Sequence, residues 1–178
     1  ELVDNGVLSR GFLDLDGSGL PLDRPLYAHQ AQAIERAAGG GRNLIVATGT
    51  GSGETESFLL PLLDSLLRER DAGTLGEPGV RAMLLYPMNA LANDQVKRLR
   101  EIFRILPEIT FGRYTGETEH DQSKALEQYR QQFHGEPLPN ELLSRDVMQA
   151  RPPHILLTNF AMLEYLLLRP ADSSLFDN

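Results

Sequence analysis

The sequence predicts an α/β fold with a parallel sheet. Short apolar runs alternate with longer segments whose apolar residues recur at helical spacing. This order is typical of parallel strands joined by crossover helices. A glycine-rich loop at residues 47–55 (Ala-Thr-Gly-Thr-Gly-Ser-Gly-Glu-Thr) stands between the first apolar run and a helical segment. Parallel strands and such a loop together indicate a protein that binds a phosphorylated ligand.

Composition limits the classes of protein to consider. The chain has 178 residues, of which 41% are hydrophobic and 24% charged, as in an ordinary globular domain. It has no cysteine, no apolar run long enough to span a membrane, and no signal-peptide pattern at its N-terminus. We therefore expect a cytoplasmic protein with no membrane partner. The net charge of −8 means that any nucleic-acid contact has to come from local motifs.

The first part of the chain predicts a lead-in loop, a helix, a strand and a second helix. Residues 1–25 are rich in Gly, Asp and Pro, and residues 29–38 are strong helix formers followed by three glycines. The apolar run at 43–47 predicts a buried strand. Residues 55–70 carry a wide apolar helical face, in which Pro61 should produce a kink or mark a shifted helix start.

The next part predicts a strand, a helix and another strand. Residues 81–86 (Arg-Ala-Met-Leu-Leu-Tyr) and 109–114 are apolar enough for buried strands. Residues 89–106 have apolar residues at helical spacing. The expected inner side of this helix consists of Leu91, Val96, Leu99, Ile102, Phe103 and Leu106.

The last part contains a long polar segment, residues 117–153, which we interpret as an insertion or mobile excursion. Within it, helices are expected near 122–133 and 140–149. An apolar run at 154–158 predicts a fourth strand, and residues 160–168 predict a helix that ends before Pro170.

The glycine loop departs from the phosphate-binding pattern G-x-x-x-x-G-K-[ST] at two positions. Thr48 takes the first glycine position, and Glu54 stands where the pattern has lysine. Glycines bring backbone N–H groups close to a phosphate, and the Thr55 hydroxyl is suited to ligate Mg²⁺. The predicted contacts to ATP phosphates are Thr48, Gly49, Thr50, Gly51, Ser52, Gly53, Glu54 and Thr55.

Glu54 places a negative charge where phosphate binding requires the positive charge of a lysine. Two unit charges ~4 Å apart interact by about 4 kcal/mol at an effective dielectric of ~20. A carboxylate also cannot donate hydrogen bonds to charge that develops during phosphoryl transfer. We therefore expect Glu54 to impair ATP binding and to abolish or severely weaken hydrolysis. Because the surrounding loop keeps the form suited to lysine, a deliberate inactivating substitution is favoured over natural drift.

A second nucleotide-binding element precedes the loop by about twenty residues, in Tyr27-Ala28-His29-Gln30. A glutamine amide can pair with the N6/N7 edge of adenine, and an aromatic ring can stack on a base. Tyr27 and Gln30 are therefore candidate adenine contacts.

The order of motifs resembles the first RecA-like lobe of superfamily 2 DEAD/DEAH-box helicases. The Tyr27–Gln30 segment resembles their Q motif, and residues 47–55 resemble motif I. Motif Ia is resembled by Leu-Tyr-Pro-Met-Asn-Ala-Leu-Ala-Asn-Asp-Gln (85–95), and the short Thr-Gly element that follows it by Tyr-Thr-Gly-Glu (114–117). Motif Ib is resembled by Leu-Thr-Asn-Phe-Ala-Met-Leu-Glu-Tyr (157–165). The sequences of these motifs are similar to those of large bacterial Mrf and Lhr-like helicases and of the antiphage-defence helicases of Druantia and DISARM systems.

The resemblance implies the function of a DNA helicase or translocase motor, driven by ATP and Mg²⁺. Motifs Ia and Ib would hold the backbone of a nucleic-acid strand, with DNA favoured over RNA. The residues concerned are Pro87, Asn89, Ala90, Thr115, Gly116, Thr158 and Asn159. All of them lie at or just after the ends of predicted strands, and ligands of open α/β sheets lie beyond the carboxyl ends of strands.

Two parts of such a motor have no counterpart in the sequence. No Asp-Glu-x-His or Asp-Glu-x-Asp pair follows a predicted strand, and no second RecA-like lobe follows. We expect these parts to lie outside this chain, together with any other defence-system subunits. Two alternatives remain open: a nucleotide-independent nucleic-acid-binding scaffold that lost its ATPase naturally, and a translocase that moves on duplex DNA without unwinding it.

Overall fold

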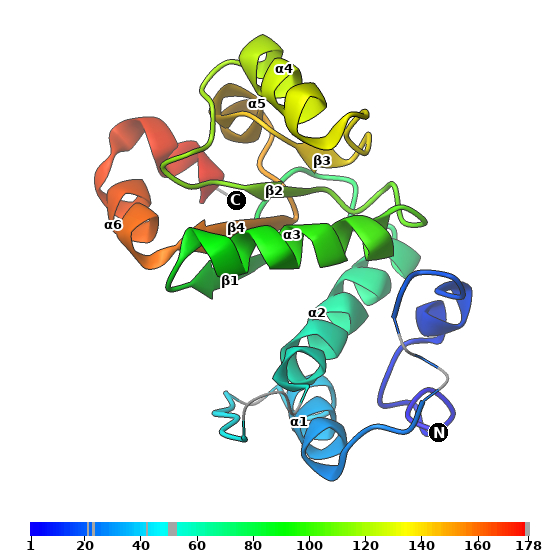
Figure 1. Ribbon diagram of the computed structural model, residues 1–178. Helices are drawn as coiled ribbons and strands as arrows, with labels where there is room; N and C mark the ends of the chain where they lie inside the picture. Colours follow the sequence, from blue (N-terminus) through cyan, green and yellow to red (C-terminus); the bar gives the residue numbers. More distant parts are fainter. Residues whose placement is uncertain (21, 23, 42, 50–52, 177–178) are drawn as a thin grey trace. The chain divides into compact units, whose positions relative to one another are not determined.

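The structure is a computed structural model that describes residues 1–20, 22, 24–41, 43–49 and 53–176. The chain forms two compact units, residues 1–75 and 76–178 (Figure 1). The first unit contains the predicted lead-in loop and the glycine loop, and the second contains the parallel sheet. In the described part of the chain, no helix is long and apolar enough to cross a membrane.

The first unit is built on two helices, α1 (Ala28–Ala38) and α2 (Glu54–Asp71), which pack against each other. They confirm the helices predicted at 29–38 and 55–70. Ile34 of α1 and Leu63 of α2 are fully buried and supply part of the core. Because α2 begins at Glu54 and continues through Pro61, this proline does not mark a shifted helix start.

The segment before α1 is tied to α2 rather than extending away from it. It forms a short 3₁₀ helix, η1 (Arg10–Asp14). The buried carboxylate of Asp64 accepts a hydrogen bond from the Ser9 amide at 2.5 Å and pairs with Arg68 Nε at 2.7 Å. Arg68 also donates to the Val7 carbonyl at 3.1 Å. Apolar side chains of this segment are buried with the helices: Leu8, Phe12, Leu15 and Leu20.

The strand predicted at 43–47 is wrong. Residues 43–49 form neither strand nor helix, and the Ile45 side chain is 98% exposed. An extended segment needs a neighbouring strand for its backbone hydrogen bonds. Every strand among the described residues belongs to residues 76–178, so the first unit offers this segment no partner.

Within the described residues, the second unit has one parallel four-stranded sheet in the order β1-β4-β2-β3. Strands β1 (Ala82–Tyr86), β2 (Phe111–Arg113) and β4 (Ile155–Asn159) confirm three predicted strands, with a shorter β2. Strand β3 (Glu141–Leu142) was not expected, because the sequence predicted helix from 140 onward. The register pairs Tyr86 with Asn159 at the carboxyl end of the sheet.

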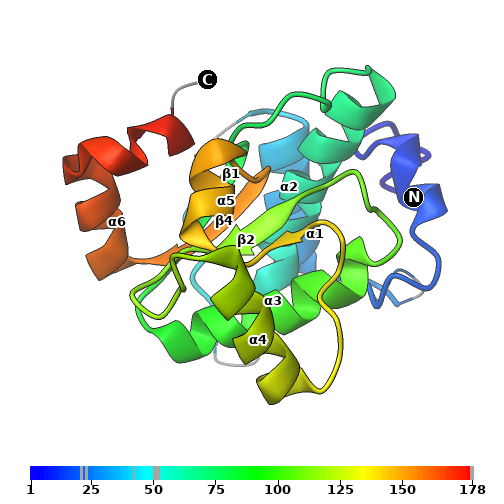
Figure 2. The same ribbon diagram turned by 90° about the horizontal axis from the view of Figure 1, so that it is seen from above.

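Helix α3 (Asn89–Phe103) crosses one face of the sheet in Figure 1. Its expected inner residues are buried except Leu91, which is 47% exposed and was wrongly placed in the core. Figure 2 shows α3 and α5 (Arg145–Ala150) on either side of the strands. Helix α6 (Phe160–Leu168) and the 3₁₀ helix η2 (Pro170–Leu175) follow β4. One core cluster joins the end of β2 with α5, β4, α6 and η2. Its buried residues are Tyr114, Met148, Leu156, Met162, Leu166 and Leu175.

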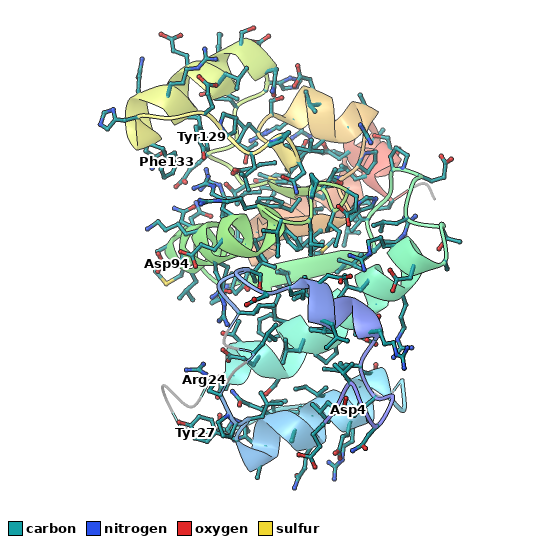
Figure 3. All side chains as sticks on the ribbon, turned by 90° about the vertical axis from the view of Figure 1, so that its right-hand side faces the viewer. Asp4, Arg24, Tyr27, Asp94, Tyr129 and Phe133 are labelled. Carbon is teal, nitrogen blue, oxygen red and sulfur yellow. The ribbon has the colours of Figure 1, made fainter. Side chains whose placement is uncertain are left out.

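Helix α4 (Gln122–Phe133) has the predicted bounds and is attached to α3 through Arg100. The Arg100 guanidinium carbon lies 4.9 Å from the centre of the Tyr129 ring and 4.4 Å from that of Phe133. Arg100 also pairs with the buried carboxylate of Glu141 on β3 at 2.7 Å. Figure 3 shows both rings on the side of α4 that faces α3. One guanidinium therefore joins α3, α4 and β3, by ion pairing and by stacking on two aromatic rings.

Candidate nucleotide loop and nucleic-acid interface

Gly53 is the residue that sets the start of α2. It adopts a left-handed conformation (φ 76°) as the N-cap, which glycine accepts without strain. A Cβ atom at this position would lie 2.5 Å from Nε2 of Gln30. Both the backbone angle and the close approach therefore require glycine. Thr50, Gly51 and Ser52, which are predicted phosphate contacts, lie outside the described residues.

Gln30 connects the two predicted nucleotide elements. Its Oε1 accepts a hydrogen bond from the Tyr27 amide at 2.8 Å, and its Nε2 donates to the Gly53 carbonyl at 2.7 Å. Nε2 also donates to Oε2 of the buried Glu56 at 3.4 Å, and Gln30 is only 3% exposed, so both amide atoms are bonded within the protein. Adenine pairing by Gln30 remains a prediction, and it requires these bonds to be exchanged.

Tyr27 lies at the start of α1, as labelled in Figure 3. Its side chain is 64% exposed, and its ring stacks on that of His29 with centroids 5.7 Å apart. An exposed ring of this kind can stack on a base. Adenine stacking by Tyr27 remains a prediction.

Glu54 is the first residue of α2 and is exposed. Its Oε1 accepts a hydrogen bond from the Thr48 hydroxyl at 2.5 Å, so the carboxylate folds back over the loop. The positive end of a helix attracts an anion, and here the chain's own carboxylate lies at that end. Among the described residues, the N-terminus of α2 and the Thr55 hydroxyl would suit a nucleotide phosphate with Mg²⁺. Glu54 does not fit it, because its charge repels the phosphate.

Three predicted nucleic-acid contacts lie at the carboxyl end of the sheet in the second unit. Asn159 is the N-cap of α6, where its Oδ1 accepts from the Met162 amide at 2.7 Å. Its Nδ2 donates to Oδ1 of Asn89, the first residue of α3, at 2.6 Å. Gly116 is exposed in the turn after β2. The parallel register brings these residues from separate segments to one edge of the sheet.

Pro87 and Ala90 are also exposed there, whereas Thr115 and Thr158 are fully buried. The Thr158 hydroxyl donates to the Tyr114 carbonyl at 2.7 Å, and the Thr115 hydroxyl accepts from the Glu117 amide at 3.3 Å. These bonds hold the backbone of the strand ends. A direct phosphate contact by either hydroxyl would need the local structure to open.

Two charged residues at this edge, Arg113 and Glu117, were not predicted from the sequence as site residues. Arg113 ends β2 and donates to Asn93 Oδ1 and, at 3.1 Å, to Glu117 Oε2. Glu117 Oε1 accepts from Asn89 Nδ2 at 2.9 Å. The only indication in the sequence was that Arg113 and Glu117 directly flank the Tyr-Thr-Gly element. Neither residue type is specific enough alone to have been selected.

Tyr114 is fully buried and donates its hydroxyl hydrogen to Asp172. Exclusion of water and the Asp172 carboxylate raise the pKa of Tyr114 from 10.0 to about 12. Gln149 donates to the same hydroxyl oxygen at 3.0 Å. The protonated phenol thus belongs to a buried polar cluster directly before Thr115.

We expect this cluster to make the second unit sensitive to alkali. The raised pKa of Tyr114 means that the protonated phenol stabilises the folded state. This contribution is complete below the unfolded pKa of 10.0 and is lost as pH rises through about 12. The loss is on the order of 2 kcal/mol. A Tyr114→Phe variant should be less stable at neutral pH but should lose less stability between these values. Urea unfolding followed over pH measures both slopes, and equal slopes would contradict the assignment.

The fold and the sites together define a class of protein. A parallel α/β sheet with polar side chains at its carboxyl edge, together with a glycine loop that opens a helix, is typical of α/β proteins that bind nucleotides. No cluster of three or more His, Asp or Glu side chains that could hold a metal ion occurs in the part of the chain that the structure describes.

The chain belongs to the DEAD/DEAH box helicase family, whose family model matches residues 27–138. Druantia protein DruE of Escherichia coli (strain UMEA 4076-1) is 30% identical over 99% of this chain and 14% of its own length. ATP-dependent helicase Lhr-Core of Methanothermobacter thermautotrophicus is 32% identical over 73% of this chain and 14% of its own length. The chain therefore spans a small part of these relatives.

A crystal structure of the DUF1998 helicase MrfA bound to DNA and AMPPNP also matches. The TM-score is 0.58 and the identity 27%, over 91% of this chain and 18% of that one. This match and the parallel sheet confirm the predicted fold class, an α/β RecA-like helicase lobe.

Proposed function

We propose that this chain is the nucleotide-binding part of the motor of an ATP-dependent DNA helicase or translocase, and that Glu54 inactivates it. The observation that carries the proposal is the Gln30–Gly53 hydrogen bond of 2.7 Å. It joins the candidate adenine-reading element to the phosphate loop within one compact unit. Direct contact between these two elements supports the proposal, because both would have to reach the same nucleotide.

The nucleic-acid part of the proposal is supported by polar residues at the carboxyl edge of the sheet, where Gly116 is exposed and Asn89 and Asn159 are half-buried. Asn89, Asn159 and Gly116 offer amide groups and open backbone to a phosphate. We propose DNA as the strand, supported by the DNA-bound relative MrfA. The rest of a helicase, including a second RecA-like lobe, is the main proposed partner.

A role in antiviral defence is supported by the similarity to Druantia protein DruE. Other subunits of such a defence system are therefore proposed partners. This is a finer proposal than the motor function, and it depends on what the whole protein assembles with.

A second candidate function is a nucleic-acid-binding scaffold that works without nucleotide. The Glu54–Thr48 hydrogen bond favours it, because the carboxylate occupies the helix end where a phosphate would bind. Both candidates require binding of nucleic acid, and they differ in what restoring a lysine would do.

The shared part of the proposal is tested by binding of labelled oligonucleotides to the whole protein, followed by fluorescence anisotropy. We expect single-stranded DNA to bind with an affinity that falls as salt rises, because phosphate contacts release counterions. RNA and blunt duplex of equal length are measured beside it. Failure to bind any of the three would contradict both candidate functions.

A further inference from the structure

The carboxylate of Glu117 lies where a strand phosphate would be expected. Its Oε1 accepts from Asn89 Nδ2 at 2.9 Å, and its Oε2 accepts from Arg113 at 3.1 Å. A carboxylate and a phosphodiester are both anions with two acceptor oxygens, and arginine binds either one. We propose that Glu117 is a built-in phosphate mimic, which a phosphodiester of the bound strand displaces to reach Arg113 and Asn89. The inference rests on the proposed function.

The two donors are held in place without Glu117. Asn159 donates to Asn89 Oδ1 at 2.6 Å, which turns the amide hydrogens of Asn89 toward Glu117. Arg113 is fixed through its bond to Asn93 on α3. The site therefore keeps its shape when the carboxylate leaves, and such preorganised donors bind an anion at lower entropic cost.

Glu117 itself is free to move away. Its side chain is 57% exposed, whereas that of Arg113 is only 26% exposed. It follows Gly116, where an added Cβ would meet no atom within 4 Å, so the turn is open to solvent. Arg113 and Glu117 also line a cleft of about 250 Å³ between α3 and α4, which leaves room beside the pair.

The free energies involved allow a strand phosphodiester to replace the Glu117 carboxylate on Arg113 and Asn89. The Glu117 carboxylate is more than half exposed, and solvent weakens its ion pair with Arg113, so a phosphodiester that also makes the neighbouring strand contacts can displace it. Isolated small anions lack those further contacts. In a chain of net charge −8, this competition keeps Arg113 neutralised until a strand is present.

The test compares Glu117→Gln with Arg113→Gln in the whole protein, by anisotropy with labelled oligothymidylate and oligouridylate of equal length. We expect Glu117→Gln to tighten binding about threefold, because a neutral amide competes less well for the donors. Arg113→Gln should weaken binding and reduce the slope of log K against log salt by about 0.7. In the Arg113→Gln background, Glu117→Gln should have a smaller effect, because only the Asn89 amide is then released.

Glu136→Gln and Arg130→Gln are matched controls, because these residues form an exposed ion pair of similar kind outside the interface. The mimic is overturned if Glu117→Gln acts no more strongly than Glu136→Gln, or if it acts equally without Arg113. A response with only one of the two oligonucleotides supports the mimic and identifies the strand. If wild type and all variants bind neither oligonucleotide, both the mimic and the proposed function are overturned. If binding persists without a Glu117 effect, only the mimic is overturned.

Discussion

Replacing Glu54 with lysine is expected to raise nucleic-acid-stimulated ATP hydrolysis by the whole protein at least about 100-fold in kcat/KM. The change removes repulsion between carboxylate and phosphate and adds a donor that neutralises charge in the transition state. Loss of one such donor costs on the order of 10²–10³ in rate, which sets the scale. The Thr48 hydroxyl, which now donates to Glu54, would also be released. Steady-state phosphate release with and without single-stranded DNA measures the effect.

Two further variants separate the causes. Glu54→Gln removes the repulsion without adding a cation, so we expect it to restore nucleotide affinity more than turnover. Glu136→Lys makes the same charge change at an exposed residue far along the sequence, and it should leave hydrolysis unchanged. If Glu54→Lys gives no more activity than Glu136→Lys, Glu54 is not the residue that limits hydrolysis, and the scaffold function becomes the better account.

Replacing Asn140 with aspartate is expected to destabilise the second unit by about 3 kcal/mol or more. Asn140 Nδ2 donates to the carbonyls of Phe103, Leu106 and Ile109 at 3.1, 3.0 and 2.9 Å, in a site that is 2% exposed. Aspartate has nearly the same shape but turns a buried donor into an acceptor that faces three carbonyl oxygens. Burying an unpaired charge against acceptors carries a penalty of this size.

Urea unfolding followed by circular dichroism measures the Asn140→Asp effect. Gln132→Glu is the control, because it makes the same amide-to-carboxylate change at an exposed position in the same unit. Equal free energies of unfolding for the two variants would show that Asn140 does not hold the end of α3 and the start of β2.

Local patterns allowed much of the fold to be predicted. The helix at 160–168 and that at 122–133 have the expected bounds, because their apolar spacing and caps are contained in neighbouring residues. The strand expected at 43–47 depends on a partner strand that the first unit lacks. Similarly, Asn140 could not be selected, since its acceptors lie 31 to 37 residues away in the sequence.

In the candidate site too, residues that neighbouring positions indicate could be selected from the sequence, whereas residues that depend on the tertiary structure could not. The glycine loop and Gln30 were selected because adjacent residues are enough to indicate their chemistry, and the structure brings Gln30 and Gly53 together. Their contacts with a nucleotide stay predictions. Thr115 and Thr158 were expected to offer hydroxyls to a strand, but these bond the backbone inside the fold. Arg113 and Glu117 were missed because their pairing with Asn89 depends on how strand ends meet.

We propose that residues 47–55 form a nucleotide site and that Glu54 alone disables it. The decisive measurement is the affinity of the whole protein for a fluorescent ATP analogue with Mg²⁺, in wild type and in Glu54→Lys. At an effective dielectric of ~20, reversing one charge ~4 Å from a phosphate changes the interaction by several kcal/mol. We therefore expect at least about 100-fold tighter binding by the lysine variant. Equal affinities in the two proteins would contradict the claim.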